Sequence, residues 1–397
     1  MYRASLVSHL PRTSCTASSR LPLGAAVRQV VTAPFSTSSS SHAQRSVKLI
    51  EVGPRDGLQN EKAVLTADLK TSLITKLANV GLRTIEAGSF VAPKWVPQMA
   101  STSEVMTSPA LDALRKEYGD SLSLPVLIPN AKGLSTFLSL LEAQPPSSIP
   151  LSNEIALFIA ASEGFSKANL NTTVQASLES LPPLIERAKT KGLKVRAYIS
   201  TVLGCPFDGR VDKGKVADLS KALLDIGAYE VSLGDTIGVG TPKGWEELIE
   251  LCRTKGVEVD KLAAHCHDTY GTAVANVLRC VELGISSLDT SIAGLGGCPY
   301  SPGATGNVAT EDVIYALETS GISTNLLPAP TSSTDPGDLL DLGSERANKF
   351  VAIAEVGEWV SQELGRTNAS RAGAAAVKRM RWLREKAEKS KAKLWTV

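Results

Sequence analysis

The stretch "VADLSKALLDIGAYEVSLGD" (216–235) contains one complete unit of the pattern that decides the fold. Its first half has apolar residues at helical spacing and ends at Gly227, where a left-handed helix end is expected. Its second half, 229–235, is a short apolar run typical of a buried strand. Helices that alternate with such strands predict parallel pairing through right-handed crossovers.

Eight such apolar runs follow one another from residue 47. They are 47–52, 82–87, 123–129, 154–160, 194–200, 229–235, 261–268 and 286–294. Helical patterns lie between them, among them 67–81, 174–192 and 272–284, and several end at a glycine (Gly81, Gly192, Gly227 and Gly284). Eight units in about 250 residues predict an α/β fold, a closed (β/α)8 TIM barrel over residues 46–325. A doubly wound open sheet is the alternative, but no GxGxxG sequence follows the first strand.

The segments on either side of the predicted barrel differ from it in composition. Residues 1–45 hold five arginines, many serines and no acidic residue, which is typical of a mitochondrial transit peptide and predicts a location in the mitochondrial matrix. A disordered tail without a targeting role is the alternative. Residues 326–375 are expected to form a linker rich in proline and serine, then C-terminal helices packed on the barrel. Residues 376–397 are strongly basic and are expected to form a solvated basic helix or tail, with binding to nucleic acid or a membrane surface as the alternative.

Charge and hydropathy exclude several classes of protein. Removal of residues 1–45 changes the formal net charge from +2 to −3. The remaining chain therefore has no excess of positive charge of the kind that binds nucleic acid. No run approaches the ~20 apolar residues that span a bilayer. We therefore expect neither nucleic acid nor a membrane as a partner. Five of the six cysteines follow the leader without a CxxC pair, which argues against a disulfide framework or a structural zinc site.

Polar side chains gather at the ends of the predicted strands, where a TIM barrel builds its active site. His265 and His267 lie two residues apart, so on a strand they share one face while Cys266 points away. Asp56 follows the first strand, and Asn307 lies in a glycine-rich loop after the eighth. Two nitrogens and two oxygens suit Mg²⁺ or Mn²⁺, with Zn²⁺ as an alternative. Two histidines hydrogen-bonded in a wet loop are the other interpretation.

Further candidates surround this predicted metal site. Arg55 either pairs with its neighbour Asp56 or polarises a substrate carbonyl. Glu86, unusual in an apolar strand, is expected to pair with a buried cation, and as a functional residue to hold a ligand or Arg55. Asp235 either orients a histidine or fixes its own turn. The remaining candidates are Gln59 for substrate binding and Glu311, which either supports the site or caps the next helix.

A single thiol, Cys298, lies in "GLGGCPYSPGATG" (294–306), among five glycines and two prolines. This composition predicts a loop, and we expect a glycine-hinged flap over the barrel mouth. A thiol in such a flap can donate or accept a proton once the flap closes. An incidental loop cysteine is the alternative.

Taken together, these motifs resemble the 3-hydroxy-3-methylglutaryl-CoA lyase family. The resemblance covers roughly residues 47–325, and its matching stretches are 50–62, 85–99, 202–209, 232–242, 265–276 and 293–312. The wider superfamily of metal-dependent barrels includes homocitrate and isopropylmalate synthases, and it shares the Arg-Asp turn, the HxH pair and the asparagine. The glycine loop that bears the cysteine is specific to the lyases. The chain departs from the family pattern at "EAGSF" (86–90) and in the tail from residue 376.

The resemblance implies a lyase that cleaves a CoA thioester, 3-hydroxy-3-methylglutaryl-CoA, to acetyl-CoA and acetoacetate, and that works as a homodimer in leucine degradation and ketone-body formation. It implies a divalent metal held by Asp56, His265, His267 and Asn307. It also implies catalytic roles for Arg55 and Cys298 and supporting roles for Glu86 and Asp235. In the reaction so implied, His265 or Asp56 takes the hydroxyl proton, Arg55 stabilises the enolate and Cys298 protonates it.

Two other functions compete with this interpretation. A condensing acyltransferase of the homocitrate synthase type would use the same metal to join acetyl-CoA to a 2-oxo acid. A barrel retained as a binding or scaffold protein would have no catalytic use for the four candidate ligands.

Overall fold

A computed structural model of the chain describes residues 45–145, 148–297, 306–329, 339 and 344–394. Eight parallel strands form one sheet in the order β1-β8-β7-β6-β5-β4-β3-β2. The strands are β1 Lys48–Glu51, β2 Gly88–Ser89, β3 Val126–Leu127, β4 Glu154–Ala160, β5 Lys194–Ser200, β6 Glu230–Asp235, β7 Leu262–Cys266 and β8 Ser287–Thr290. Seven predicted runs contain a strand, and the second, 82–87, ends directly before β2.

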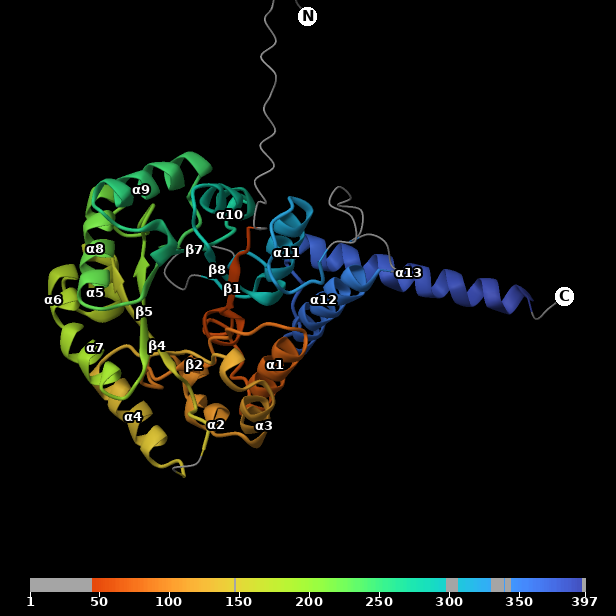
Figure 1. Cartoon of the computed structure of the whole chain (residues 1–397), viewed down its shortest axis with the longest axis horizontal. Helices are drawn as coiled ribbons and strands as arrows, with labels where there is room; N and C mark the ends of the chain where they lie inside the picture. The colour runs from red at the N-terminus through yellow and green to blue at the C-terminus, as the bar shows by residue number, and fades with distance from the viewer. Residues whose placement is uncertain (1–44, 146–147, 298–305, 330–338, 340–343, 395–397) are drawn as a thin grey trace, which may run out of the picture. The chain divides into compact units, whose positions relative to one another are not determined.

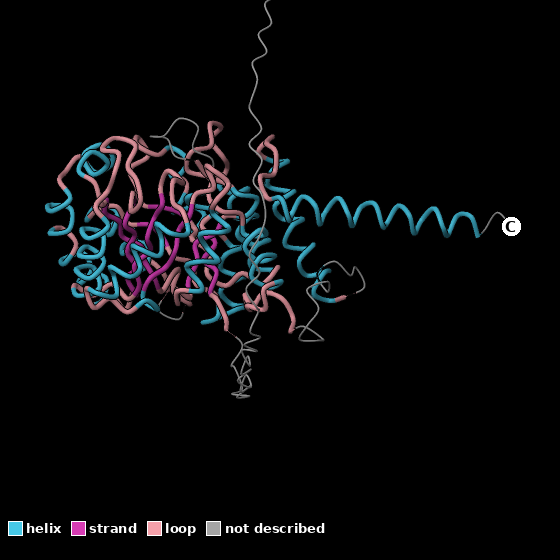
Figure 2. Tube along the Cα trace, turned by 90° about the horizontal axis from the view of Figure 1, so that it is seen from above, coloured by secondary structure: helices cyan, strands magenta, loops and turns pink. Residues whose placement is uncertain are grey.

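The sheet closes between the end of β1 and the segment that leads into β2. Glu51 pairs in parallel with Ile85. The Glu51 N–H donates to the Thr84 oxygen, and the Glu86 N–H donates to the Glu51 oxygen, both at 2.9 Å. The predicted TIM barrel is thereby confirmed, and Figure 2 shows its strands at the centre with helices around them.

Helices follow the strands and cover the outside of the barrel (Figure 1). Those up to β8 are α1 Ala67–Asn79, α2 Thr102–Met106, α3 Pro109–Tyr118, α4 Ala131–Glu142, α5 Glu163–Leu170, α6 Val174–Glu179, α7 Pro182–Lys189, α8 Lys213–Asp225, α9 Pro242–Thr254 and α10 Ala273–Glu282. After β8 come α11 Thr310–Thr319, α12 Glu345–Glu363 and α13 Arg371–Leu394. None of the described helices is long and apolar enough to cross a membrane.

Local chemistry accounts for where these helices end. The four glycines predicted at helix ends all have positive φ, for example +107° at Gly227, which costs glycine little because it has no Cβ. The single helix predicted over 174–192 was wrong. The structure has two helices there, with the second starting at Pro182, because proline lacks the N–H that a continuing helix needs.

Residues along each central strand alternate between two environments. On β5, Arg196 and Tyr198 point into the barrel, while the residues between and beside them pack in the hydrophobic core under the helices (Val195, Ala197 and Ile199). Arg196 contacts Asp289 on β8 at 2.8 Å, although β6 and β7 lie between these strands in the sheet. The contact therefore crosses the inside of the barrel, which holds buried charges.

The expected C-terminal helices are present beside β1 and β8. Helix α12 packs against α1 and α13, and α13 also contacts α11 (Figure 1). Between α12 and α13, the Ala369 N–H donates to the Ala293 oxygen at 3.1 Å. Ala293 lies just after β8 and has φ +56°, so the C-terminal segment supports the turn that leads from β8 toward Asn307.

Candidate metal centre and active site

A buried π-helical turn, Gly53–Gly57, follows β1 and presents Arg55 and Asp56. Two glycines allow this turn to pack closely. A Cβ on Gly53 would lie 2.4 Å from the Glu51 carboxylate, and one on Gly57 would lie 2.7 Å from the Ser291 hydroxyl. The "GPRDG" sequence thus turns the chain at the barrel mouth and buries both charged side chains.

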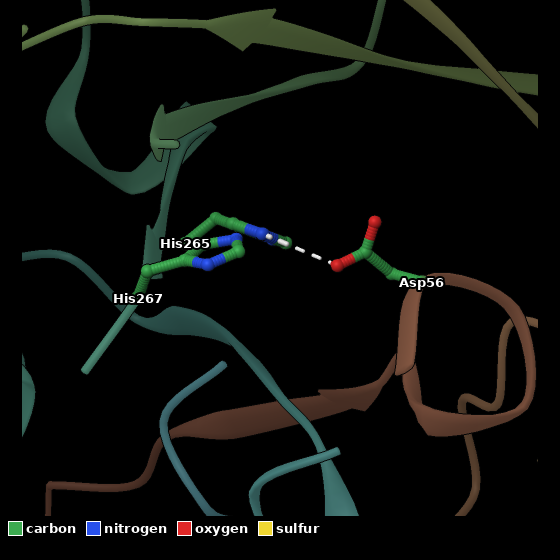
Figure 3. Close-up of side chains that lie close together, drawn as sticks. All are labelled: Asp56, His265 and His267. Carbon is green, nitrogen blue, oxygen red and sulfur yellow. Dashed lines mark ion pairs between the residues drawn. The ribbon is translucent and has the colours of Figure 1, made fainter. Parts of the chain in front are cut away.

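Asp56 lies opposite the two histidines of β7 and its end (Figure 3). One potential ligand atom from each of Asp56, His265 and His267 lies within 4.8 Å of the others. The His265 Nε2 is 3.9 Å from the Asp56 Oδ2. All three residues are buried. The structure therefore brings together three of the four predicted metal ligands, and both histidines share one face as the strand period predicted.

Asn307 completes the predicted set. It pairs with His267 in a short antiparallel bridge, and its Nδ2 donates to the Asp56 Oδ2 at 2.8 Å. Its Oδ1 is buried without a hydrogen-bond partner among the described residues. An unsatisfied buried amide oxygen is costly, and a hard divalent cation would satisfy it. The four donors therefore fit a divalent metal.

The charge on Asp56 is favourable for binding a cation. Burial alone would raise the pKa of this carboxyl, but Arg55, His265 and His267 outweigh burial and lower it to about 2. Asp56 is therefore a carboxylate at neutral pH. Gln59, the predicted substrate-binding residue, donates from its Nε2 to the Asp56 Oδ1 at 2.9 Å.

Arg55 is held by two carboxylates. Its Nη1 lies 2.6 Å from the Asp56 Oδ1, and its Nε and Nη2 lie 2.8 and 2.7 Å from the Glu86 Oε2. The Tyr198 hydroxyl donates to the same Glu86 oxygen at 3.2 Å. Glu86 therefore forms the expected buried pair and orients the Arg55 guanidinium beside the candidate metal site.

Two predicted supporting residues, Asp235 and Glu311, accept hydrogen bonds from backbone N–H groups. The Asp235 carboxylate accepts from the Val239 and Gly240 N–H groups at 3.1 and 2.8 Å, so it fixes its own turn. Glu311, buried in the first turn of α11, accepts from the Ala293 N–H at 2.9 Å. The predicted catalytic Cys298 and residues 298–305 of the predicted flap lie outside the described residues.

Asp289, which was not among the predicted site residues, contacts the site histidine His265. Its Oδ2 lies 3.1 Å from the His265 Nδ1. Glu51 was also missed: it accepts from the Gly53 and Ile292 N–H groups, both at 2.9 Å. The available signal was the same one that marked Glu86, an acidic residue inside an apolar strand.

Comparison with known proteins places the chain in a family. The HMGL-like family model matches residues 46–329. A curated relative from Bos taurus, a mitochondrial hydroxymethylglutaryl-CoA lyase, is 46% identical over 291 residues, which is 73% of this chain and 84% of the relative.

Solved structures show the same similarity. A hydroxymethylglutaryl-CoA lyase from Pseudomonas aeruginosa superposes with a TM-score of 0.69 at 42% identity, over 84% of this chain and 98% of that one. An HMG-CoA lyase from Acinetobacter baumannii, solved with coenzyme A and 3-methylmalate, gives a TM-score of 0.68 at 29% identity, over 83% and 95% of the two chains.

Proposed function

The chain belongs to the HMGL-like family, and we propose from this premise that it cleaves 3-hydroxy-3-methylglutaryl-CoA to acetyl-CoA and acetoacetate with the help of a divalent metal. The observation that carries the proposal is the convergence of Asp56, His265, His267 and Asn307 at the barrel mouth, with Arg55 beside them. The named lyases at 42–46% identity support the substrate.

We propose Mg²⁺ or Mn²⁺ as the metal, held by Asp56, His265, His267 and Asn307. Carboxylate and amide oxygens favour these hard cations, and the imidazoles make Mn²⁺ and Zn²⁺ acceptable. A bound ion would supply Lewis acidity that lowers the pKa of a tertiary hydroxyl beside it.

In the proposed reaction, one residue of the chain removes a proton from the substrate and another stabilises the negative charge that develops. Asp56, directly or through water, takes the proton of the substrate hydroxyl. His265 has no free ring nitrogen for this role if its Nε2 holds the ion, because its Nδ1 contacts Asp289. As that oxygen becomes the ketone of acetoacetate, the adjacent C–C bond breaks and its electron pair forms the enolate of acetyl-CoA. Arg55, fixed by Glu86, donates hydrogen bonds to the developing enolate oxygen.

Cys298 is proposed as the acid that completes the reaction. Its thiol gives a proton to the enolate carbon and yields acetyl-CoA, and the proton taken at the start returns to the sulfur. The support is the composition of the loop around Cys298 and the family resemblance.

A CoA thioester as the substrate is supported by the coenzyme A in the Acinetobacter baumannii structure. On the family resemblance alone we also propose a homodimer, which light scattering of the purified chain tests.

We propose the mitochondrial matrix as the place of action. The Arg-rich, acid-free leader at 1–45 supports it, and so does the mitochondrial relative from Bos taurus. Residues 1–45 fused to a fluorescent reporter should direct the reporter to mitochondria, whereas a leader with its five arginines changed to glutamine should not.

Product analysis tests the proposed reaction against the condensing alternative. Purified protein with Mg²⁺ should release acetoacetate from 3-hydroxy-3-methylglutaryl-CoA. Release of free CoA from acetyl-CoA and 2-oxoglutarate instead would identify a condensing acyltransferase, and no turnover of either mixture would favour a binding protein.

A further inference from the structure

The carboxylate of Asp289, inside the barrel, contacts the candidate metal ligand His265. Asp289 is 1% exposed on β8, and its Oδ2 lies 3.1 Å from the His265 Nδ1. We propose that Asp289 is a positioning residue, which fixes the tautomer and ring orientation of His265 so that its Nε2 faces the metal. This inference rests on the proposed metal centre.

Asp289 is itself held in place by side chains inside the barrel that donate hydrogen bonds to it. Arg196 donates to both carboxylate oxygens, at 2.8 and 3.2 Å, and the Ser232 hydroxyl donates to the Oδ2 at 2.6 Å. The Arg196 Nε in turn donates to Glu230 at 2.6 Å. The Asp289 carboxylate therefore has a fixed orientation before any ligand binds.

The neighbours of Asp289 determine which nitrogen of His265 carries hydrogen. The Asp289 carboxylate is surrounded by donors, so it offers only acceptor positions to the ring. A neutral His265 must then donate from Nδ1, which leaves a lone pair on Nε2. That Nε2 faces Asp56, 3.9 Å from its Oδ2 (Figure 3). Carboxylates that fix metal-binding imidazoles in this way strengthen metal binding.

Among the described residues, Asp289 is the acidic side chain that forms a hydrogen bond with the His265 Nδ1. The sequence suggested Asp235 as the residue that orients a histidine, but its carboxylate accepts hydrogen bonds from the Val239 and Gly240 N–H groups instead. The strand register explains the difference, because His265 pairs with Asp289 across β7 and β8.

The test compares Mn²⁺ binding to three full-length proteins by calorimetry: wild type, Asp289→Asn and the control Glu318→Gln. The control alters a buried carboxylate on α11 that pairs with Arg346 at 3.0 Å and has no part in the network around Asp289. We expect Asp289→Asn to bind Mn²⁺ roughly 10–100-fold more weakly, and Glu318→Gln to bind as tightly as wild type. Equal affinity in all three proteins, or equal loss in both variants, would overturn the proposal.

A second readout needs neither metal nor activity. The full chain has four histidines, so ¹⁵N-histidine labelling gives four pairs of ring signals, one Nδ1 and one Nε2 in each pair, and His265→Gln identifies the pair that belongs to His265. In metal-free wild type at a pH where the ring is neutral, His265 should carry its hydrogen on Nδ1. In Asp289→Asn a substantial Nε2–H population should appear, and an unchanged tautomer would contradict the proposal.

If Asp289→Asn does not fold, Ser232→Ala keeps the carboxylate and removes one of its supports. It should weaken Mn²⁺ binding less than Asp289→Asn would, in the same direction, and unchanged affinity would count against the proposal. Wild type that binds Mn²⁺ but releases no acetoacetate would contradict the proposed lyase function alone.

Discussion

Each charged side chain of the site is held by other polar side chains. Arg55 joins Asp56 to Glu86, and Asn307 joins the same aspartate to the loop after β8. Buried charges are tolerated when they are paired and hydrogen-bonded in this way. Because each side chain is fixed by its neighbours, we expect a single conservative substitution to change the positions of the groups that act in the reaction.

Replacement of Arg55 by lysine keeps the positive charge but removes the fork that contacts both carboxylates. We expect kcat to fall by about 10²–10³, the typical cost of losing one oriented donor, with circular dichroism unchanged. The control Arg187→Lys, whose guanidinium donates to the Ser135 hydroxyl on α4 at 2.8 Å, should keep wild-type kcat. A comparable kcat in Arg55→Lys would contradict the proposed role.

Loss of the Cys298 thiol should remove the acid that protonates the enolate. We expect Cys298→Ala to lower turnover by roughly 10²–10⁴ while Mn²⁺ affinity stays at the wild-type value. Cys266→Ala is the matched control, because that thiol packs in the core away from the site. If Cys298→Ala retained wild-type turnover, the assignment would be wrong.

The sequence identified the site ligands more readily than their supports. His265 and His267 stand out because residues two apart share a strand face, and the structure places Asp56 and Asn307 with them. Asp235 and Asp289 both lie in strands with similar sequence patterns. Which of them reaches His265 depends on the strand register, which no local pattern encodes.

At the scale of elements, the loop between β8 and α11 must return to the barrel mouth to deliver Asn307. Gly306 permits the close approach, because a Cβ there would lie only 2.0 Å from the Gly294 carbonyl oxygen. The obstacle is backbone and cannot rotate away, so any side chain at Gly306 displaces its neighbour Asn307.

Substitution of Gly306 by alanine should therefore weaken Mn²⁺ binding and destabilise the fold by about 1–3 kcal/mol, as overpacking usually does. The control Gly244→Ala lies in α9, where a Cβ meets nothing closer than 3.4 Å. It should leave metal binding unchanged and raise stability by about 0.5–1 kcal/mol. Urea unfolding and calorimetry provide both readouts, and wild-type metal binding in Gly306→Ala would refute the argument.

The order and type of the elements were largely predictable because strand and helix periods differ. The alternation on β5 and the glycines after the helices are local features that the structure confirms. The barrel's closure through Glu51 and Ile85 is not local. It depends on residues 34 apart in the sequence pairing at the edge of the sheet, which only the complete ring of strands determines.

For the whole molecule, buried carboxyls should shape how stability depends on pH. Burial raises the pKa of Glu51 to about 7 and that of Glu311 to about 8. In the unfolded chain both protonate near pH 4.5. The folded state therefore holds more protons than the unfolded state between these values, and stability falls as pH rises from about 5 to about 8.

Glu311→Gln should remove the contribution of Glu311 to this pH dependence, since glutamine resembles the neutral acid and does not ionise. Its free energy of unfolding relative to wild type should rise across that window by about 1.4 kcal/mol per pH unit at most. Urea titrations at several pH values measure it, with the exposed Glu179→Gln as control. A constant difference between Glu311→Gln and wild type would show that Glu311 does not titrate there.

The metal dependence of the lyase reaction tests the central claim most directly. Acetoacetate release from 3-hydroxy-3-methylglutaryl-CoA should stop when EDTA removes divalent ions from the full-length protein, and it should return when Mg²⁺ or Mn²⁺ is added back. His267→Ala should not recover under the same additions. Acetoacetate release that continues in the metal-free protein would contradict the account.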